Sequence, residues 1–220
     1  MRRVSPTRAH ENQFPRTEVF LNCPFDSAYL PLYQAIVFTV MALGYQIRMA
    51  LEVENSGLSR LAKIVDIIRE TPYGIHDISR AGADEQTGLA RFNMPLELGL
   101  FLGAREYGDS RQGQKVALIL DSEPNRYRKF ISDIAGNDIE VHMNDPEVVV
   151  MKVRNWLSNN SGSTQLPLGG KGVVNHYHKF MMDFPAIRDV LGHDHDVPFK
   201  DFIMIVRDWL QATPLPDGSR

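Results

Sequence analysis

The chain has 220 residues, a formal net charge of −3 and a hydrophobic content of 43%. This length suits one domain with a full core and a small appendage, and the composition argues against a disordered chain. The acidic balance weighs against a dedicated duplex-binding protein, so direct nucleic-acid binding is not expected. With one cysteine and no apolar run of roughly 18 residues, the sequence predicts a cytoplasmic protein without disulfides or membrane contact.

Short apolar segments with strand character alternate with helical patterns from about residue 18 to about residue 157. Such alternation is typical of a parallel sheet covered on both faces. Five strands suit a flavodoxin-like doubly wound α/β fold, in which ligands bind beyond the carboxyl ends of the strands. The expected strands are 18–22, 45–53, 73–79, 114–121 and 138–142, and the expected helices are 29–44, 59–71, 93–104, 123–136 and 145–159.

The pattern divides the chain into four parts. Residues 1–17 are interpreted as a flexible lead, residues 18–158 as the α/β domain, and residues 159–172 as a linker rich in Gly, Ser and Asn. Residues 173–213 carry apolar side chains at helical spacing and predict a C-terminal helical extension. Two short helices cannot bury such faces on each other alone. They must fold back on the α/β domain or pack against another chain. We expect that they pack against another copy of this chain, so that the protein is a homo-oligomer.

Polar side chains gather where the expected strands end, and most of them are explained by loop composition and helix capping. They include Asn22, Cys23 and Asp26 after the first strand, and Ser79 and Arg80 after the third. Asp77 is harder to explain, because it lies inside the apolar pattern of the third strand. Its neighbour His76 should point to the opposite face of the sheet, as strand alternation requires, and is expected to be a core or surface histidine.

Glu97 is the other acid that loop composition does not explain. It lies four residues after Asn93, near the positive end of a helix dipole, where a carboxylate is favoured by roughly 0.3–1 kcal/mol. It could be simply a helix-start acid. Its helix, however, is apolar nearly all round, which predicts burial. A buried carboxylate needs a partner or a chemical role.

The stretch "FNMPLELGLFLGA" followed by "KVALILD" resembles a segment of TIR-like nucleotide-binding domains and the Glu–Leu–Gly–x–Ala motif of nucleoside 2-deoxyribosyltransferases. The matching residues are Asn93, Glu97, Leu98, Gly99 and Gly103. "VFLNCPFDSAY" and "YGIHDIS" resemble the first and third strands of the same superfamily, so the resemblance covers about residues 18–155. Two features of those families are missing. The adaptor-type Ser-x-x-Asp/Glu loop is absent, which argues against adaptor scaffolding, and the absent glycine-rich opening loop leaves base specificity open.

In both families the glutamate at the position of Glu97 acts at the anomeric carbon of an N-glycoside. In the transferases the aspartate at the position of Asp77 contacts the sugar. The resemblance therefore implies an enzyme that cleaves an N-glycosidic bond, with Glu97 and Asp77 as catalytic residues. NAD is expected as a substrate rather than a cofactor, and no cofactor or metal is expected. Bacterial members of the superfamily often serve in antiviral defence, so the resemblance implies a role of this kind for the chain.

Elementary chemistry agrees with these roles. Cleavage of a sugar–base bond passes through an oxocarbenium-like state, which a nearby carboxylate can stabilise or attack. A second carboxylate can hold the sugar hydroxyls in position. Aromatic side chains can stack on the base and arginines can bind a phosphate, although core packing and surface charge would explain the same residue types. The expected substrate-binding residues are Asn22, Phe25, Ser79, Arg80, Phe92 and Asn93, with Tyr29 and Arg91 as further candidates.

Two alternatives stay open. The same chemistry would serve a nucleoside or nucleotide 2-deoxyribosyltransferase or hydrolase. A catalytically silent module that binds a nucleotide or supports assembly would show the same pattern of residues without turnover.

Overall fold

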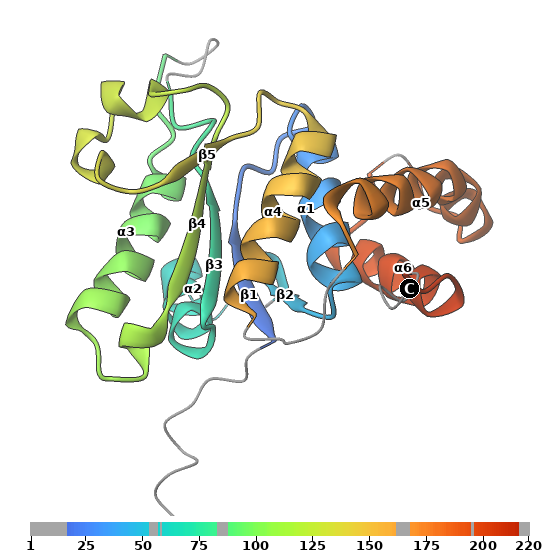
Figure 1. The fold of residues 1–220 in the computed structure, drawn as a ribbon, viewed down its shortest axis with the longest axis horizontal. Helices are drawn as coiled ribbons and strands as arrows, with labels where there is room; N and C mark the ends of the chain where they lie inside the picture. Colours follow the sequence, from blue (N-terminus) through green and yellow to red (C-terminus); the bar gives the residue numbers. More distant parts are fainter. Residues whose placement is uncertain are drawn as a thin grey trace, which may run out of the picture.

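The computed structural model describes residues 17–52, 57, 59–82, 88–161, 168–194 and 196–215. It contains a five-stranded, all-parallel sheet in the order β2-β1-β3-β4-β5 with helices on both faces (Figure 1), so the predicted doubly wound α/β fold is confirmed. Residues 1–16 of the predicted lead lie outside the described residues. The strands are β1 (Glu18–Asn22), β2 (Gln46–Arg48), β3 (Tyr73–Asp77), β4 (Val116–Asp121) and β5 (Ile139–Val141).

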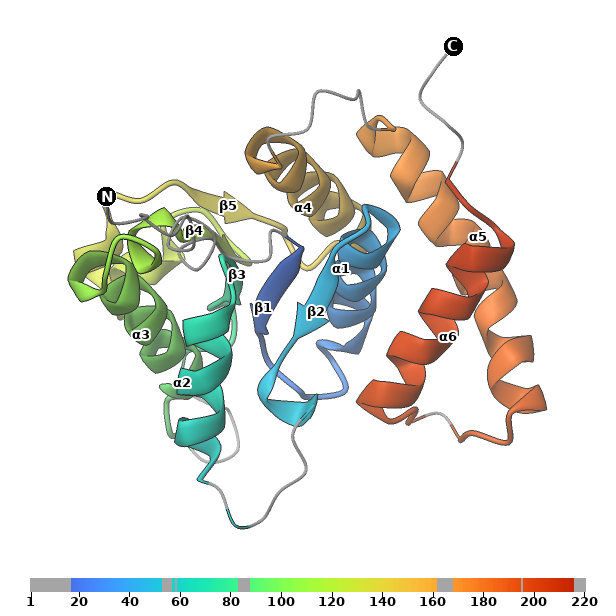
Figure 2. The same ribbon diagram turned by 90° about the horizontal axis from the view of Figure 1, so that it is seen from below.

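Two helices cover each face of the sheet. Helices α1 and α4 pack together on one face and α2 and α3 on the other (Figure 2). Since β1 leads into α1 and β3 leads into α3, the chain leaves these neighbouring strands toward opposite faces. The region between their carboxyl ends, which we call the crevice, is therefore where a doubly wound fold binds ligands. The helices are α1 (Leu30–Ala42), α2 (Arg60–Glu70), α3 (Asn93–Tyr107), α4 (Pro146–Asn160), α5 (Gly170–Val190) and α6 (Phe199–Ala212).

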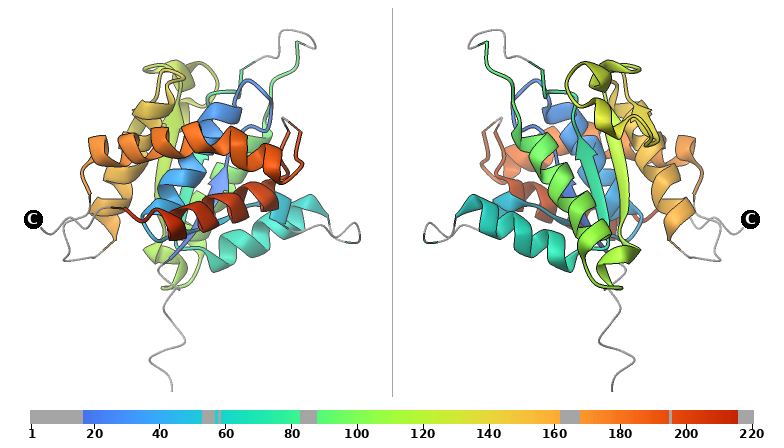
Figure 3. Two further views of the ribbon diagram at one scale, coloured as in Figure 1. Left: turned by 90° about the vertical axis from the view of Figure 1, so that its right-hand side faces the viewer. Right: turned by 90° about the vertical axis from the view of Figure 1, so that its left-hand side faces the viewer.

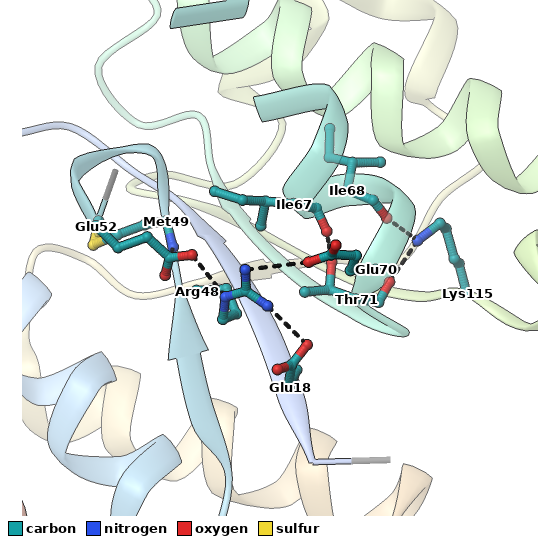
Figure 4. Close-up of polar contacts among 9 residues, drawn as sticks. All are labelled: Glu18, Arg48, Met49, Glu52, Ile67, Ile68, Glu70, Thr71 and Lys115. Carbon is teal, nitrogen blue, oxygen red and sulfur yellow. Dashed lines mark hydrogen bonds and ion pairs between the residues drawn. The ribbon is translucent and has the colours of Figure 1, made fainter. Parts of the chain in front are cut away.

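The second strand is shorter than the predicted 45–53, because the chain turns after Arg48 into the 3-10 turn η1 (Ala50–Glu52). Figure 4 shows the cause. Arg48 donates from Nε to Glu52 and from its terminal nitrogens to Glu18 and Glu70. Glu52 also accepts from the backbone N–H of Met49, so its side chain holds the turn closed.

The helix predicted over residues 123–136 is not formed. Two 3-10 turns stand there instead, η3 (Arg126–Lys129) and η4 (Ser132–Ile134). Asn125 has a left-handed backbone with φ of 59°, which a regular helix does not allow. Arg126 then donates to the side chain of Asp121 at 2.7 Å and to the carbonyl of Ile78 at 2.6 Å. These two bonds tie the turn to the ends of β3 and β4.

The C-terminal helices α5 and α6 fold back on the α/β domain, so the reason for expecting them to pair with another chain is wrong. They lie side by side over α1 (Figure 3), and Phe38 of α1 packs against Phe180 and Trp209 at ring-centroid distances of 5.3 and 6.0 Å. Their apolar faces belong to the main core cluster. The homo-oligomer itself stays a prediction. The predicted linker overlaps helices at both ends, because α4 continues to Asn160 and α5 begins at Gly170.

None of the described helices combines the length and the apolar character that crossing a membrane requires.

Candidate functional site

The site residues expected from the sequence lie on two segments, one that follows β1 and one that leads from β3 into α3. One wall is the segment that follows β1, which carries Asn22 and Phe25. The other is the segment from the end of β3 to the first turns of α3, in which residues 83–87 lie outside the described residues. This second wall carries Asp77, Ser79, Arg80, Phe92, Asn93 and Glu97.

Asn22 joins the two walls. Asn22 is buried, and its side-chain amide nitrogen donates to the carbonyl of Met94 in the first turn of α3 at 2.9 Å. The same nitrogen lies 3.1 Å from Nδ1 of His76, which is its register partner on β3. With these contacts Asn22 fixes the start of α3 against β1, which is a positioning role. The expected contact with a substrate stays a prediction.

His76 and Asp77 point to opposite faces, as strand alternation requires. The ring of His76 packs edge-on against Phe101 of α3 at 4.9 Å. Burial, together with the charge of Lys115, lowers the pKa of His76 to about 3, so the ring is neutral. The expectation of a core histidine is confirmed.

Asp77 faces α1 and is fully buried. Its Oδ2 accepts a 2.6 Å hydrogen bond from the hydroxyl of Tyr29 and lies 3.1 Å from Nε2 of His142. Nδ1 of His142 accepts from the backbone N–H of Asn144, so a neutral ring carries its proton on Nε2, toward Asp77. Oδ1 of Asp77 accepts from the backbone N–H of Ser79. Both carboxylate oxygens therefore have protein partners, and a direct contact with a sugar would have to displace one.

Glu97 approaches the crevice from the opposite face, on the second turn of α3. The burial expected from the sequence is confirmed, with 6% of the residue exposed. The helix is not buried on all sides, however, since Leu96 is 54% exposed. Burial raises the pKa of Glu97 from 4.5 to about 7, and the charge of Arg60 opposes part of this rise. At neutral pH the side chain is thus poised between its acid and its carboxylate.

Among the described residues, Arg60 is the one that forms an ion pair with Glu97. Its Nη2 lies 3.9 Å from Oε1 of Glu97, which is long for an ion pair, and the Arg60 side chain is 52% exposed. The same guanidinium lies 5.7 Å from the ring centre of Phe25, which is 48% exposed. Phe25 therefore presents a ring to solvent beside Arg60, and its stacking on a base stays a prediction.

A second arginine, Arg91, links the segment before α3 to the segment after β1. Nη1 of Arg91 lies 2.9 Å from Oδ2 of Asp26, and Oδ1 of Asp26 accepts from the backbone N–H of Tyr29. Asp26 thus shapes the turn before α1 and ties it to the segment before α3. Arg91 is engaged with this carboxylate, which makes it a weaker candidate for a phosphate.

Cys23, which directly follows β1, is buried. Burial raises the pKa of its thiol well above the ordinary value, and the charges of Asp77, Glu97 and Asp26 raise it further. A thiol held protonated is a poor nucleophile, so Cys23 is not a candidate for covalent chemistry.

The remaining expected residues, Ser79, Arg80, Phe92 and Asn93, lie on the segment that leads from β3 into α3. The hydroxyl of Ser79 and Nε of Arg80 are buried and have no hydrogen-bond partner among the described residues. The positive charge of Arg80 acts on Tyr29, so Arg80 lies near the Asp77 cluster. Phe92 is 68% exposed and stands at the N-cap of α3, and Asn93 is the exposed first residue of that helix. Both are accessible to a ligand.

Sequence reasoning missed Arg60 and His142 and did not foresee that Tyr29 would bond to Asp77. Each has a positional signal. His142 directly follows β5, and Arg60 opens α2, so both stand at the carboxyl edge of the sheet. Tyr29 precedes α1 in the first loop of the crevice. Among the residues that the structure describes, no group of three or more His, Cys, Asp or Glu side chains could hold a metal ion.

Comparisons with family models, with curated proteins and with solved structures give no match. The geometry above therefore carries the functional argument, together with the resemblance in the motif.

Proposed function

We propose that the chain cleaves the N-glycosidic bond of a nucleotide, with NAD as the expected substrate. One observation carries the proposal. Glu97 is a buried carboxyl group at the ligand-binding edge of a doubly wound sheet, with a long ion pair and a pKa raised to about 7. Perturbed carboxyl groups in such places are candidates for catalysis.

In this reaction the bond between the anomeric carbon and the base nitrogen breaks, and its electron pair leaves with the base. Positive charge develops on the sugar, and the ionised carboxylate of Glu97 would stabilise it. A water molecule then attacks the anomeric carbon, forms the new C–O bond and releases a proton to solvent. Among the described residues Arg60 is the cation that acts on Glu97, at 3.9 Å, so the carboxylate is not neutralised by a close ion pair and its charge can act on the sugar.

Asp77 is proposed as a residue that positions the site. Tyr29 and Ser79 donate hydrogen bonds to its carboxylate, and Nε2 of His142 lies 3.1 Å from Oδ2. If one of these partners is displaced, the carboxylate would orient the sugar hydroxyls. Phe25 and Phe92 supply exposed rings for the base.

The test is incubation of the purified chain with NAD, with 2-deoxynucleosides and with nucleotides, followed by detection of the free base. Release of nicotinamide from NAD supports the proposal. Cleavage of deoxynucleosides alone would favour the transferase or hydrolase alternative. Binding of a nucleotide without any released base, at low and at high protein concentration, would favour the non-catalytic module.

A further inference from the structure

Arg60, the first residue of α2, contacts one residue from each side of the crevice. Its Nη2 lies 3.9 Å from Oε1 of Glu97, and its guanidinium carbon lies 5.7 Å from the ring centre of Phe25. The Arg60 side chain is nevertheless 52% exposed. A cation is therefore held beside the proposed reacting carboxyl group, on a side chain that a ligand can reach from solvent.

The N–H groups of this guanidinium are not saturated by protein partners. Charge-assisted hydrogen bonds between a guanidinium and a carboxylate span about 2.7–2.9 Å, so the 3.9 Å contact with Glu97 is not such a bond. Among the described residues, the Arg60 side chain donates no hydrogen bond. Arg91, by contrast, donates to Asp26 at 2.9 Å. Arg60 is thus better placed than Arg91 to bind an anion.

The chemistry of Arg60 favours a phosphate as that anion. The planar fork of N–H groups in a guanidinium matches the oxygens of a phosphate and can donate two bonds to it at once. The ring of Phe25 supports the cation from one side, and such a contact stabilises a guanidinium. Phosphate is also the group that distinguishes a nucleotide from a nucleoside.

The contact between Arg60 and Glu97 suits the two ends of one sugar phosphate. In the proposed reaction Glu97 lies against the anomeric carbon of the sugar. In a 5′-nucleotide only the sugar ring and one further carbon separate the anomeric carbon from the phosphate ester. A phosphate bound on the side of the guanidinium away from Glu97 would therefore belong to the same sugar. The cation would then stand between the two negative groups and reduce their repulsion.

We propose that Arg60 binds the phosphate on the reacting sugar, so that the substrate is a nucleotide or a dinucleotide and not a nucleoside. This inference rests on the proposed function and narrows its substrate class. It gives Arg60 a role in specificity, and it argues against the deoxynucleoside alternative. The identity of the base stays open.

Binding of two stable sugars tests this role without any turnover. Ribose 5-phosphate and ribose have no base to release, so the full chain can be titrated with each by isothermal calorimetry. Wild type should bind ribose 5-phosphate about tenfold or more tightly than ribose, and Arg60→Gln should reduce this preference about tenfold, as expected when a charge-assisted contact is lost. A wild type that binds both sugars equally, or binds neither, overturns the proposal. So does an Arg60→Gln variant that keeps the preference.

Arg69→Gln is the matched control. It removes an arginine from the same helix, at a side chain that is 62% exposed and pairs with Asp66 at 2.6 Å. Its preference for ribose 5-phosphate should equal that of wild type. A loss as large as that of Arg60→Gln would show a general effect of surface charge and would contradict a specific phosphate site.

Turnover of a second pair of compounds separates phosphate recognition from an indirect effect on Glu97. Nicotinamide mononucleotide and nicotinamide riboside contain the same glycosidic bond, and only the first carries a phosphate. Arg60→Gln should lower kcat/KM for the mononucleotide about tenfold more than for the riboside, chiefly by raising KM. A variant that acts only through the ionisation of Glu97 would slow both compounds by the same factor, and this result would contradict the assignment.

The two experiments can fail independently. If neither compound releases its base although ribose 5-phosphate binds through Arg60, the proposed cleavage is wrong and the phosphate site stands. If NAD is cleaved but the preference for a phosphate does not depend on Arg60, the proposed function stands and the role of Arg60 is wrong.

Discussion

The hydroxyl of Tyr29 donates a 2.6 Å hydrogen bond to Oδ2 of Asp77, and both residues are fully buried. Tyr29→Phe removes this donor from a buried carboxylate. Hydrogen bonds to charged groups contribute about 1.5–3 kcal/mol, so we expect the free energy of unfolding to fall by that amount. Urea denaturation measures it. Tyr107→Phe, at a residue that is 89% exposed, is the control and should have no effect.

Asp77→Asn tests whether the same carboxylate matters for turnover. The amide keeps the volume but lacks the charge, and it places an N–H group opposite Tyr29 or His142. If Asp77 positions the substrate, turnover and substrate binding should fall together in the folded variant, and Asp77→Ala should lower both further. A variant that is less stable but fully active would make Asp77 a purely structural residue.

The pH dependence of stability tests the environment of Glu97. Because burial raises its folded-state pKa from 4.5 to about 7, the folded state keeps a proton that the unfolded state releases between these values. The contribution of Glu97 to the free energy of unfolding should therefore be most favourable below pH 4.5 and should fall as the pH rises to about 7. Glu97→Gln stays neutral, so it should be more stable than wild type above pH 7 by about 1–3 kcal/mol.

Thermal or urea unfolding of both proteins at pH 5 and pH 8 gives the comparison. Glu106→Gln, an exposed acid near the other end of α3, should show no such difference. An unchanged gap between Glu97→Gln and wild type at the two pH values would show that the carboxyl group is not perturbed.

Lys115 is buried at the opposite edge of the sheet, where its amine donates to the carbonyls of Ile68 and Thr71 at the end of α2 (Figure 4). Lys115→Met leaves these two buried carbonyl groups without their hydrogen-bond donor. Each unsatisfied group costs about 1–3 kcal/mol, so α2 should be anchored less firmly and the protein less stable by at least that amount. Lys179→Met, on the exposed side of α5, is the control. Equal stability of the two variants would contradict this role.

The packing of α5 and α6 on α1 predicts a large effect at Phe38. Its ring contacts Tyr177, Phe180 and Trp209 at centroid distances from 5.3 to 6.0 Å. Phe38→Ala should cost about 3–5 kcal/mol and alter the fluorescence of Trp209. Met182→Ala, at an 81% exposed position of α5, should do neither. Light scattering on the full chain separately tests the predicted homo-oligomer.

The parallel sheet was predictable from the sequence because its signals are local. The first strand is an apolar run that Pro24 ends, and α4 opens on Asp145, whose side chain accepts from the N–H of Glu147. The turn after Arg48 and the 3-10 turns after Asn125 were not predictable. They depend on side-chain bonds to residues distant in sequence, such as Arg48 to Glu18 and Arg126 to Ile78.

The same distinction holds for the site. Glu97 and Asp77 could be proposed because a carboxylate inside an apolar pattern is conspicuous. Their partners Arg60 and His142 come from α2 and from the end of β5, and only the folded sheet brings them near. One feature of the sequence indicates that α5 and α6 pack on α1. Helix α1 is apolar nearly all round, as expected of a helix that is covered on two sides.

The measurement that tests the central claim most directly is release of free base from NAD by wild type, Glu97→Gln and Glu106→Gln at equal concentration and pH 8. We expect wild type and Glu106→Gln to release nicotinamide at the same rate, and Glu97→Gln to be slower by about a hundredfold or more, the typical cost of losing one electrostatic stabiliser. Circular dichroism checks that the three proteins are equally folded. Turnover by Glu97→Gln at the wild-type rate would contradict the assignment of Glu97 as the reacting carboxylate.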